Sequence, residues 1–236
     1  IGGTGIGACD DLDRVIAVAK EFNLYVHVDA AWAGSAMICS EFRCLWRGVE
    51  GADSIVLNPH KWLGAQFDLS AHFLKNPADL VRTLAIRPEY LKTIGREGVI
   101  NYSEWSIPLG RRFRALKLWF LFRCYGLENL RMRIRNHVLW SQEITEQIRQ
   151  TQNFEITSEP ILSLFTFRYA PKDYADLDEL NRRLINAIND DGRIYLTQTT
   201  LDDKFVIRFQ TGQFETTRED VQTAYFVIVE LAKTLC

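Results

Sequence analysis

The sequence has no long apolar run and no strong excess of charge of either sign. Its 28 Lys and Arg residues nearly cancel 30 Asp and Glu residues, which leaves a net charge of −2. A membrane-spanning helix needs about 18 or more consecutive apolar residues, and the richest stretch, Leu116 to Phe122, is interrupted by Lys117. We therefore predict no membrane span, and the balanced charge argues against binding to nucleic acid or to a membrane surface.

Cysteine is sparse and histidine is scarce. The five cysteines are odd in number and form no CxxC motif, and the four histidines lack the spacing of a metal site such as HExxH. The pattern predicts neither a disulfide framework nor a metal centre, and is typical of reduced thiols in a cytoplasmic protein. The cysteines are Cys9, Cys39, Cys44, Cys124 and Cys236.

The chain also lacks an initial Met and a recognisable secretory signal. It begins at Ile1 inside a glycine-rich stretch, and we expect an N-terminal portion to precede it. The stretch Gly2 to Gly7 has no following Lys-Ser or Lys-Thr, so it does not match a nucleotide-binding P-loop.

What is present is a globular composition, with 47% hydrophobic and 25% charged residues. At roughly 150 residues per domain, 236 residues predict one large domain or one and a half. In the first part, a helix capped by Asp10 or Asp11 is expected to end near Asn23, and three short apolar strands follow. This alternation predicts an α/β fold with a parallel sheet between helices. The three strands are expected at 24–28, 54–57 and 69–74.

The second part has a different pattern. A short helix is expected after Asn76-Pro77, and residues 93–99, with two glycines and mixed charge, predict a mobile surface loop. Two helices should follow, from Leu109 to Gly126 and from Leu127 to Thr151, and then a smaller α+β unit. In that unit we expect strands at 161–169 and 205–209 and helices at 174–189 and 217–235.

Chemically distinctive residues follow the first two predicted strands. Asp29 ends the first strand, and Lys61 comes shortly after the second. In an open parallel sheet, ligands bind beyond the carboxyl ends of the strands. A lysine amine and a carboxylate at such an edge fit pyridoxal 5′-phosphate (PLP), with the Lys forming a Schiff base and the Asp holding the ring nitrogen. From spacing alone, an ordinary Asp–Lys ion pair remains the commoner explanation.

Several spaced motifs resemble one family, the group II PLP-dependent amino-acid decarboxylases, and among them most closely the aromatic-L-amino-acid decarboxylases. The resemblance covers essentially the whole chain. It rests on HVDAAWAGS at 27–35, ADSIVLNPHKW at 52–62, RPEYLK at 87–92, IPLGRRFRALK at 107–117 and DKFVIRF at 203–209.

This resemblance implies the type I, aspartate aminotransferase-like fold and a homodimer with shared active sites. Family subunits are about twice as long as this chain. Residues 1–118 would then be the C-terminal part of the PLP-binding large domain, and residues 119–236 a linking helix with the small C-terminal domain. The half not represented here would hold a ring-stacking histidine, most of the phosphate-binding residues and much of the substrate pocket.

Residue by residue, the resemblance assigns Lys61 as the Schiff-base lysine and Asp29 as the partner of the pyridinium nitrogen. Ala31 matches the small residue packed on one ring face, and Thr4 a hydroxyl near the phenolic oxygen of the cofactor. Asn58 and His60 match residues of the phosphate and lysine region, and for His60 a structural role is as well supported as a direct one.

Two further assignments concern the reaction outcome and the substrate. Tyr90 matches the tyrosine of a mobile loop that reaches the neighbouring subunit and protonates the substrate carbon, whereas phenylalanine there goes with an aldehyde-forming outcome. A phenol can donate a proton and a phenyl ring cannot, so Tyr90 favours formation of an amine. Gly110 matches a segment near the substrate ring pocket, although a glycine near a helix start also has ordinary backbone uses.

The expected activity is therefore PLP-dependent decarboxylation of an L-amino acid, aromatic in the leading hypothesis, to an amine and carbon dioxide. Three alternatives remain open. The first is the same scaffold acting on glutamate or histidine, or forming an aldehyde. The second is another type I PLP enzyme such as a transaminase, and the third is a non-catalytic fragment or interaction module. By itself this chain is expected to show little or no turnover.

The assignment of Asp29 predicts the behaviour of Asp29→Asn. An amide cannot hold the ring nitrogen in its charged form, so we expect partial retention of PLP binding and loss of most of the turnover. The measurement, made on the complete protein, is the rate of carbon dioxide release together with a PLP titration, and unchanged turnover would refute the assignment.

Overall fold

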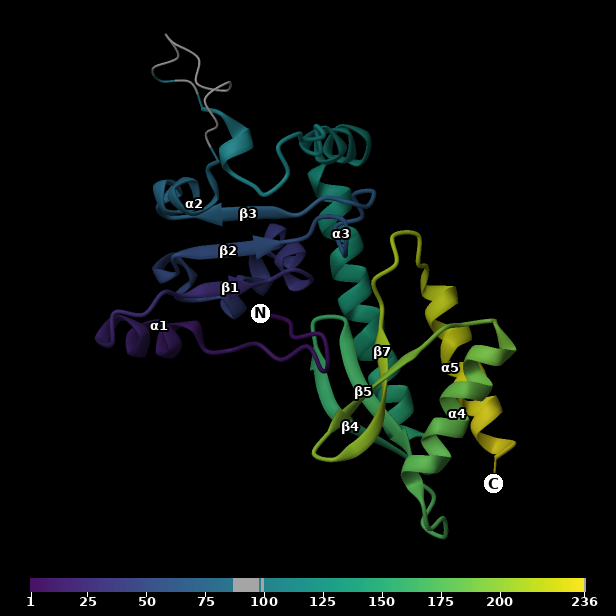
Figure 1. Ribbon diagram of the computed structural model, residues 1–236. Helices are drawn as coiled ribbons and strands as arrows, with labels where there is room; N and C mark the ends of the chain where they lie inside the picture. Colours follow the sequence, from purple (N-terminus) through teal and green to yellow (C-terminus); the bar gives the residue numbers. More distant parts are fainter. Residues whose placement is uncertain (87–97, 99, 236) are drawn as a thin grey trace.

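The computed structural model describes residues 1–86, 98 and 100–235. These residues form two sheets joined by one long helix, with the N-terminus beside the smaller sheet and the C-terminus at the far end of the second unit (Figure 1). Within this described part of the chain, no helix is both long and apolar enough to cross a membrane.

The first sheet has three short strands in the order β1-β2-β3. These are β1 (His27–Asp29), β2 (Ser54–Leu57) and β3 (Ala71–Leu74). β1 and β2 are parallel, with Asp29 opposite Val56, and β3 is antiparallel to β2. The prediction of a parallel sheet is therefore wrong for the direction of β3. The connection over residues 58–70 contains no helix to carry the chain back to the starting edge, so the next strand returns in the opposite direction.

Capped helices flank this sheet. α1 (Leu12–Glu21) begins where the Asp11 carboxylate accepts the Arg14 backbone N–H, and α2 (Pro77–Leu84) begins after Asn76, which accepts from Ala78. Both caps agree with the sequence prediction. Short 3-10 helices complete the unit, namely η1 (Ala33–Ile38), η2 (Ser40–Trp46), η3 (Val49–Gly51) and η5 (Tyr102–Glu104).

The linking helix α3 (Ala115–Gln150) runs past both units (Figure 1). Gly126, with φ 71° and ψ 158°, is non-helical and kinks it, which agrees with the predicted break between two helices. A positive φ is readily adopted by glycine, which has no Cβ. The helix starts at Ala115 and not at Leu109, and Arg112 and Arg114 in the preceding segment form ion pairs with Asp68.

The second unit is a four-stranded antiparallel sheet in the order β4-β5-β7-β6, packed against α3 and two further helices. The elements are β4 (Phe154–Ile161), β5 (Leu164–Tyr169), α4 (Leu177–Asp191), β6 (Thr197–Leu201), β7 (Lys204–Gln210) and α5 (Arg218–Lys233). Both helices and β7 lie where the sequence predicts them. The strand expected at 161–169 is wrong at its start, because a turn at Leu162, with φ 55°, separates β4 from β5.

Two buried apolar clusters form the cores. The first includes Val28 and Trp62, and the second includes Phe165 and Ile188. α3 contributes to both, with Ile134 in the first and Ile144 in the second. The domain boundary at 118/119 stays a prediction, because the linking helix packs into both cores.

Asn181 provides a test of the second core. Its side chain is fully buried and makes three hydrogen bonds, from the Tyr169 N–H and to the Tyr169 and Leu177 carbonyl oxygens. We expect Asn181→Ala to lower the free energy of unfolding by about 2–3 kcal/mol, because these bonds are lost in a dry environment. Urea unfolding measures this loss. The control, Asn186→Ala on the exposed face of the same helix, should change stability by less than about 0.5 kcal/mol.

Candidate active site

Backbone hydrogen bonds bring the ends of β1 and β2 together at one edge of the first sheet. The Ala30 N–H donates to Val56 O at 2.9 Å, and the Asn58 N–H donates to Ala31 O at 2.9 Å. The Lys61 N–H then donates to Asn58 O at 2.9 Å, which closes a turn and places Lys61 near the strand end. The parallel register therefore holds the segment after Asp29 beside the turn that carries Lys61.

Asp29 and Lys61 line the same cavity, of about 350 Å³, together with Thr4, Ala31 and Trp32. Asp29 Oδ1 accepts the Ala31 N–H at 2.9 Å. Among the described residues, no ion pair joins Asp29 to Lys61, and the exposed Lys61 side chain has no hydrogen-bond partner. The ordinary ion pair, which was the simplest alternative, is therefore absent between these two side chains.

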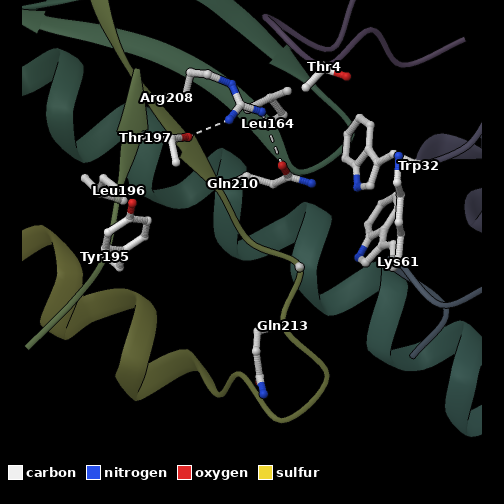
Figure 2. Close-up of a pocket in the computed structure, with 12 residues that line it drawn as sticks. Thr4, Trp32, Lys61, Leu164, Tyr195, Leu196, Thr197, Arg208, Gln210 and Gln213 are labelled. Carbon is white, nitrogen blue, oxygen red and sulfur yellow. Dashed lines mark hydrogen bonds between the residues drawn. The ribbon is translucent and has the colours of Figure 1, made fainter. Parts of the chain in front are cut away.

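A second cavity, of about 510 Å³, adjoins the first and shares Thr4, Trp32 and Lys61 with it. It lies between the two units, and Figure 2 shows Lys61 and Trp32 on one side and Arg208 of β7 on the other. Both cavities lie within the size range of small-molecule sites. A ligand held by Lys61 therefore has space on both sides of the lysine.

Arg208 is the charged residue that the second unit contributes to the lining of the larger cavity, which Lys61 also lines. Its guanidinium donates to Thr197 Oγ1 at 2.6 Å, to Gly5 O at 2.9 Å and to Gln210 Oε1 at 3.4 Å. All three acceptors are neutral, and no acidic side chain pairs with Arg208 in the described part of the chain. Burial lowers the pKa of this guanidinium, yet arginine stays charged in proteins. Three of its five N–H groups are used, so two remain for a ligand.

The other predicted site residues fall into three groups. Thr4 and Ala31 line the cavities. Asn58 and His60 line neither and instead hold the returning segment, since Ser70 Oγ donates to Asn58 Oδ1 at 2.6 Å and His60 Nδ1 lies 2.6 Å from Leu69 O. Gly110 is exposed and lines neither cavity.

Tyr90 lies outside the described residues, so its place relative to the site stays a prediction.

A buried aromatic group supports the Lys61 turn. The indoles of Trp32 and Trp62 stack with centroids 5.1 Å apart and planes 21° apart. Trp62 Nε1 donates to Nδ1 of His137, on α3, at 3.0 Å. Burial, reinforced by the nearby Arg133 guanidinium, lowers the pKa of His137 to about 4. His137 is therefore neutral at pH 7 and carries its proton on Nε2, because Nδ1 accepts a hydrogen bond.

Sequence reasoning missed Arg208, Trp32, Trp62 and His137 as site residues. A signal existed for Arg208, because it is the one charged residue within the otherwise apolar segment Phe205–Phe209. The role of His137 had no comparable signal, since its partner lies 75 residues away in the chain.

Residues 1–170 match the family described as the pyridoxal-dependent decarboxylase conserved domain. Among curated proteins, the chain is 42% identical to the aromatic-L-amino-acid decarboxylase of Mus musculus, over 100% of this chain and 48% of the mouse protein. The chain spans about half the length of the curated relatives it matches.

Solved structures agree on the fold. A crystal structure of Oryza sativa TDC with PLP and tryptamine superposes with a TM-score of 0.94, at 35% identity, covering 99% of this chain and 49% of that one. A crystal structure of Rhodiola rosea 4-hydroxyphenylacetaldehyde synthase gives a TM-score of 0.89 at 33% identity, covering 99% of this chain and 48% of that one. The predicted type I fold, present here in part, is confirmed.

The buried His137 predicts a stability loss in acid. Its pKa of about 4 in the folded chain lies below the usual value of 6.5, so its contribution is fully present above pH 6.5 and is lost as the pH falls toward 4. The loss should approach ~3 kcal/mol, at 1.36 kcal/mol per pKa unit. Urea unfolding of wild type and His137→Asn between pH 7.5 and 4 measures it. A stability difference between the two proteins that stays constant over this range would contradict the prediction.

Proposed function

Because the chain belongs to the pyridoxal-dependent decarboxylase family, we propose that it carries the lysine-bearing part of an active site that decarboxylates an aromatic L-amino acid to its amine. The observation that carries this proposal is the shared cavity of Asp29 and Lys61, in which the two side chains form no ion pair with each other. The Lys61 amine and the Asp29 carboxylate are thus both free to bind a third molecule.

The residues present fit PLP. Lys61 offers an unpaired amine for the aldehyde of the cofactor, and Asp29 offers a carboxylate in the same cavity for the ring nitrogen. Ala31 lines the cavity between the end of β1 and the turn that carries Lys61. Because its side chain is small, it leaves room for a flat ring. PLP, when bound, supplies an electron sink for the electrons released as carbon dioxide leaves.

The chain's own residues then have separate tasks. The Ala31 N–H fixes one oxygen of the Asp29 carboxylate, which leaves the other to keep the ring nitrogen protonated. Lys61 would hold the cofactor and be displaced by the incoming amino group. Tyr90 is the proposed donor of the proton that returns to the substrate carbon.

Arg208 is the proposed anchor for the substrate carboxylate. It lines the larger cavity together with Lys61, carries two unused N–H groups and has no acidic partner among the described residues (Figure 2). A guanidinium matches a carboxylate with paired hydrogen bonds, and such charge-assisted bonds are stronger than neutral ones.

A second candidate outcome is aldehyde formation, because one structural relative is a 4-hydroxyphenylacetaldehyde synthase. Tyr90 favours the amine, since its phenol can return a proton to carbon. Assays for amine, aldehyde and hydrogen peroxide on the complete protein distinguish the two outcomes.

We also propose a cytoplasmic homodimer. Support comes from the free thiols of the four described cysteines and from exposed apolar side chains at the start of α3, Trp119 and Phe120 among them.

Borohydride reduction tests the proposed function directly. The complete protein is loaded with PLP, reduced and digested, and the label is mapped by mass spectrometry. We expect the label at Lys61 and release of carbon dioxide from aromatic amino acids before reduction. Lys61→Ala should abolish both, whereas the control Lys75→Ala, at an exposed lysine outside both cavities, should change neither. Label at a different lysine would overturn the proposal.

The proposed carboxylate anchor predicts a specific kinetic effect. Arg208→Gln removes charge-assisted hydrogen bonds worth about 1.5–3 kcal/mol, so kcat/KM should fall by roughly 10- to 150-fold. PLP affinity should change far less. Arg218→Gln, at an exposed arginine paired with Glu143, is the control and should stay within twofold of wild type. An unchanged kcat/KM in Arg208→Gln would exclude this role.

A further inference from the structure

Two side chains of α3 hold the turn that carries Lys61. His137 Nδ1 accepts the Trp62 indole N–H at 3.0 Å, and Arg133 Nη2 donates to Leu63 O at 2.6 Å. Arg133 and His137 are four residues apart, so they lie on one face of the helix. The two residues after Lys61 are therefore both fixed to α3.

The same turn is fixed to the segment after Asp29. Trp32, three residues beyond Asp29, stacks on Trp62, and both indoles are buried, with 9% and 1% of their surfaces exposed. An indole held on one face by a stacked ring and at its N–H by an acceptor has little freedom to rotate. Trp62 therefore connects Asp29, Lys61 and α3.

His137 suits this task because an indole N–H can only donate. The histidine is fully buried and presents the lone pair of Nδ1 to Trp62, while its Nε2 has no hydrogen-bond partner within the described residues. Its single side-chain hydrogen bond is the one that holds the residue next to Lys61. A histidine kept only for packing would not need to aim its acceptor at that N–H.

We propose that His137 is a positioning residue, which acts through Trp62 to hold the Lys61 amine opposite Asp29. The proposal rests on the proposed function for its consequence in catalysis, but the placement of Lys61 can be measured without turnover. His137 touches neither cavity, but Trp62, to which it is hydrogen-bonded, lines the larger one.

The test compares variants that remove or keep the acceptor, in the complete protein loaded with PLP. His137→Leu removes it, and His137→Asn keeps an oxygen near the position of Nδ1. We expect His137→Leu to lower kcat by about tenfold, to leave the KM for the amino acid within about twofold, and to weaken PLP binding by about fivefold. His137→Asn should restore kcat to within about threefold of wild type.

A double variant and a matched control separate positioning from packing. Trp62→Phe removes the donor, so Trp62→Phe/His137→Leu should lose no more kcat than the more impaired single variant. Ser141→Ala alters a buried side chain one turn further along α3 whose hydroxyl has no partner, and it should leave kcat and PLP affinity unchanged. Fully multiplicative losses in the double variant would overturn the proposal.

A cofactor-free measurement decides the proposal independently of the proposed function. Lys61 is acetylated in the PLP-free protein with limiting acetic anhydride, and its rate is read by mass spectrometry relative to Lys75. We expect His137→Leu to change this ratio at least threefold and His137→Asn to restore it. If the wild-type protein releases no carbon dioxide, the proposed function is wrong. The acetylation ratio would still test whether His137 positions Lys61. If His137→Leu lowers only stability and leaves the ratio unchanged, the positioning role is wrong.

Discussion

Two backbone hydrogen bonds beyond the strand ends, Ala30 N–H to Val56 O and Asn58 N–H to Ala31 O, determine the geometry of the site. They continue the parallel pairing of β1 and β2 past the last strand residues, so the two connecting segments leave the sheet side by side. A carboxylate from one segment and an amine from the other then face one cavity. With antiparallel pairing, the end of one strand would lie beside the start of the other, and the two groups would be separated by the strand length.

The linking helix connects this edge of the sheet to the second unit. α3 packs into both cores, and its buried residues Ile134 and Ile144 belong to different apolar clusters. The same helix presents Arg133 and His137 to the turn after Lys61. The turn after Lys61 and the core of the second unit are therefore both packed against one helix.

The charges near the site are divided between structural and available groups. Arg112 and Arg114 bind Asp68 and hold the start of α3, and the Arg114 guanidinium, with Arg112 beside it, keeps the pKa of Asp68 near 2. Arg208 and Lys61, by contrast, have no acidic partner in the described part of the chain. Unneutralised cations facing a cavity suit an anionic ligand, whereas a cation already paired with a carboxylate offers much less attraction.

The sequence by itself determined the elements with strong local signals. The caps at Asp11 and Asn76, the break at Gly126 and the central strand β7 all follow from residue types at fixed spacing, and Asp29 and Lys61 follow from motifs beside strand ends. Tertiary structure decided the rest. The sequence pattern did not reveal β4 and β6, which are both edge strands. β4 contains a proline and bulges, and β6 is rich in threonine, so neither has a clear apolar pattern. Each of these strands is stabilised by pairing with a neighbouring strand. The direction of β3 and the partners of Arg208 and His137 depend on contacts between residues distant in the chain. Such contacts depend on how distant segments pack together, so they cannot be predicted from a local pattern of residues.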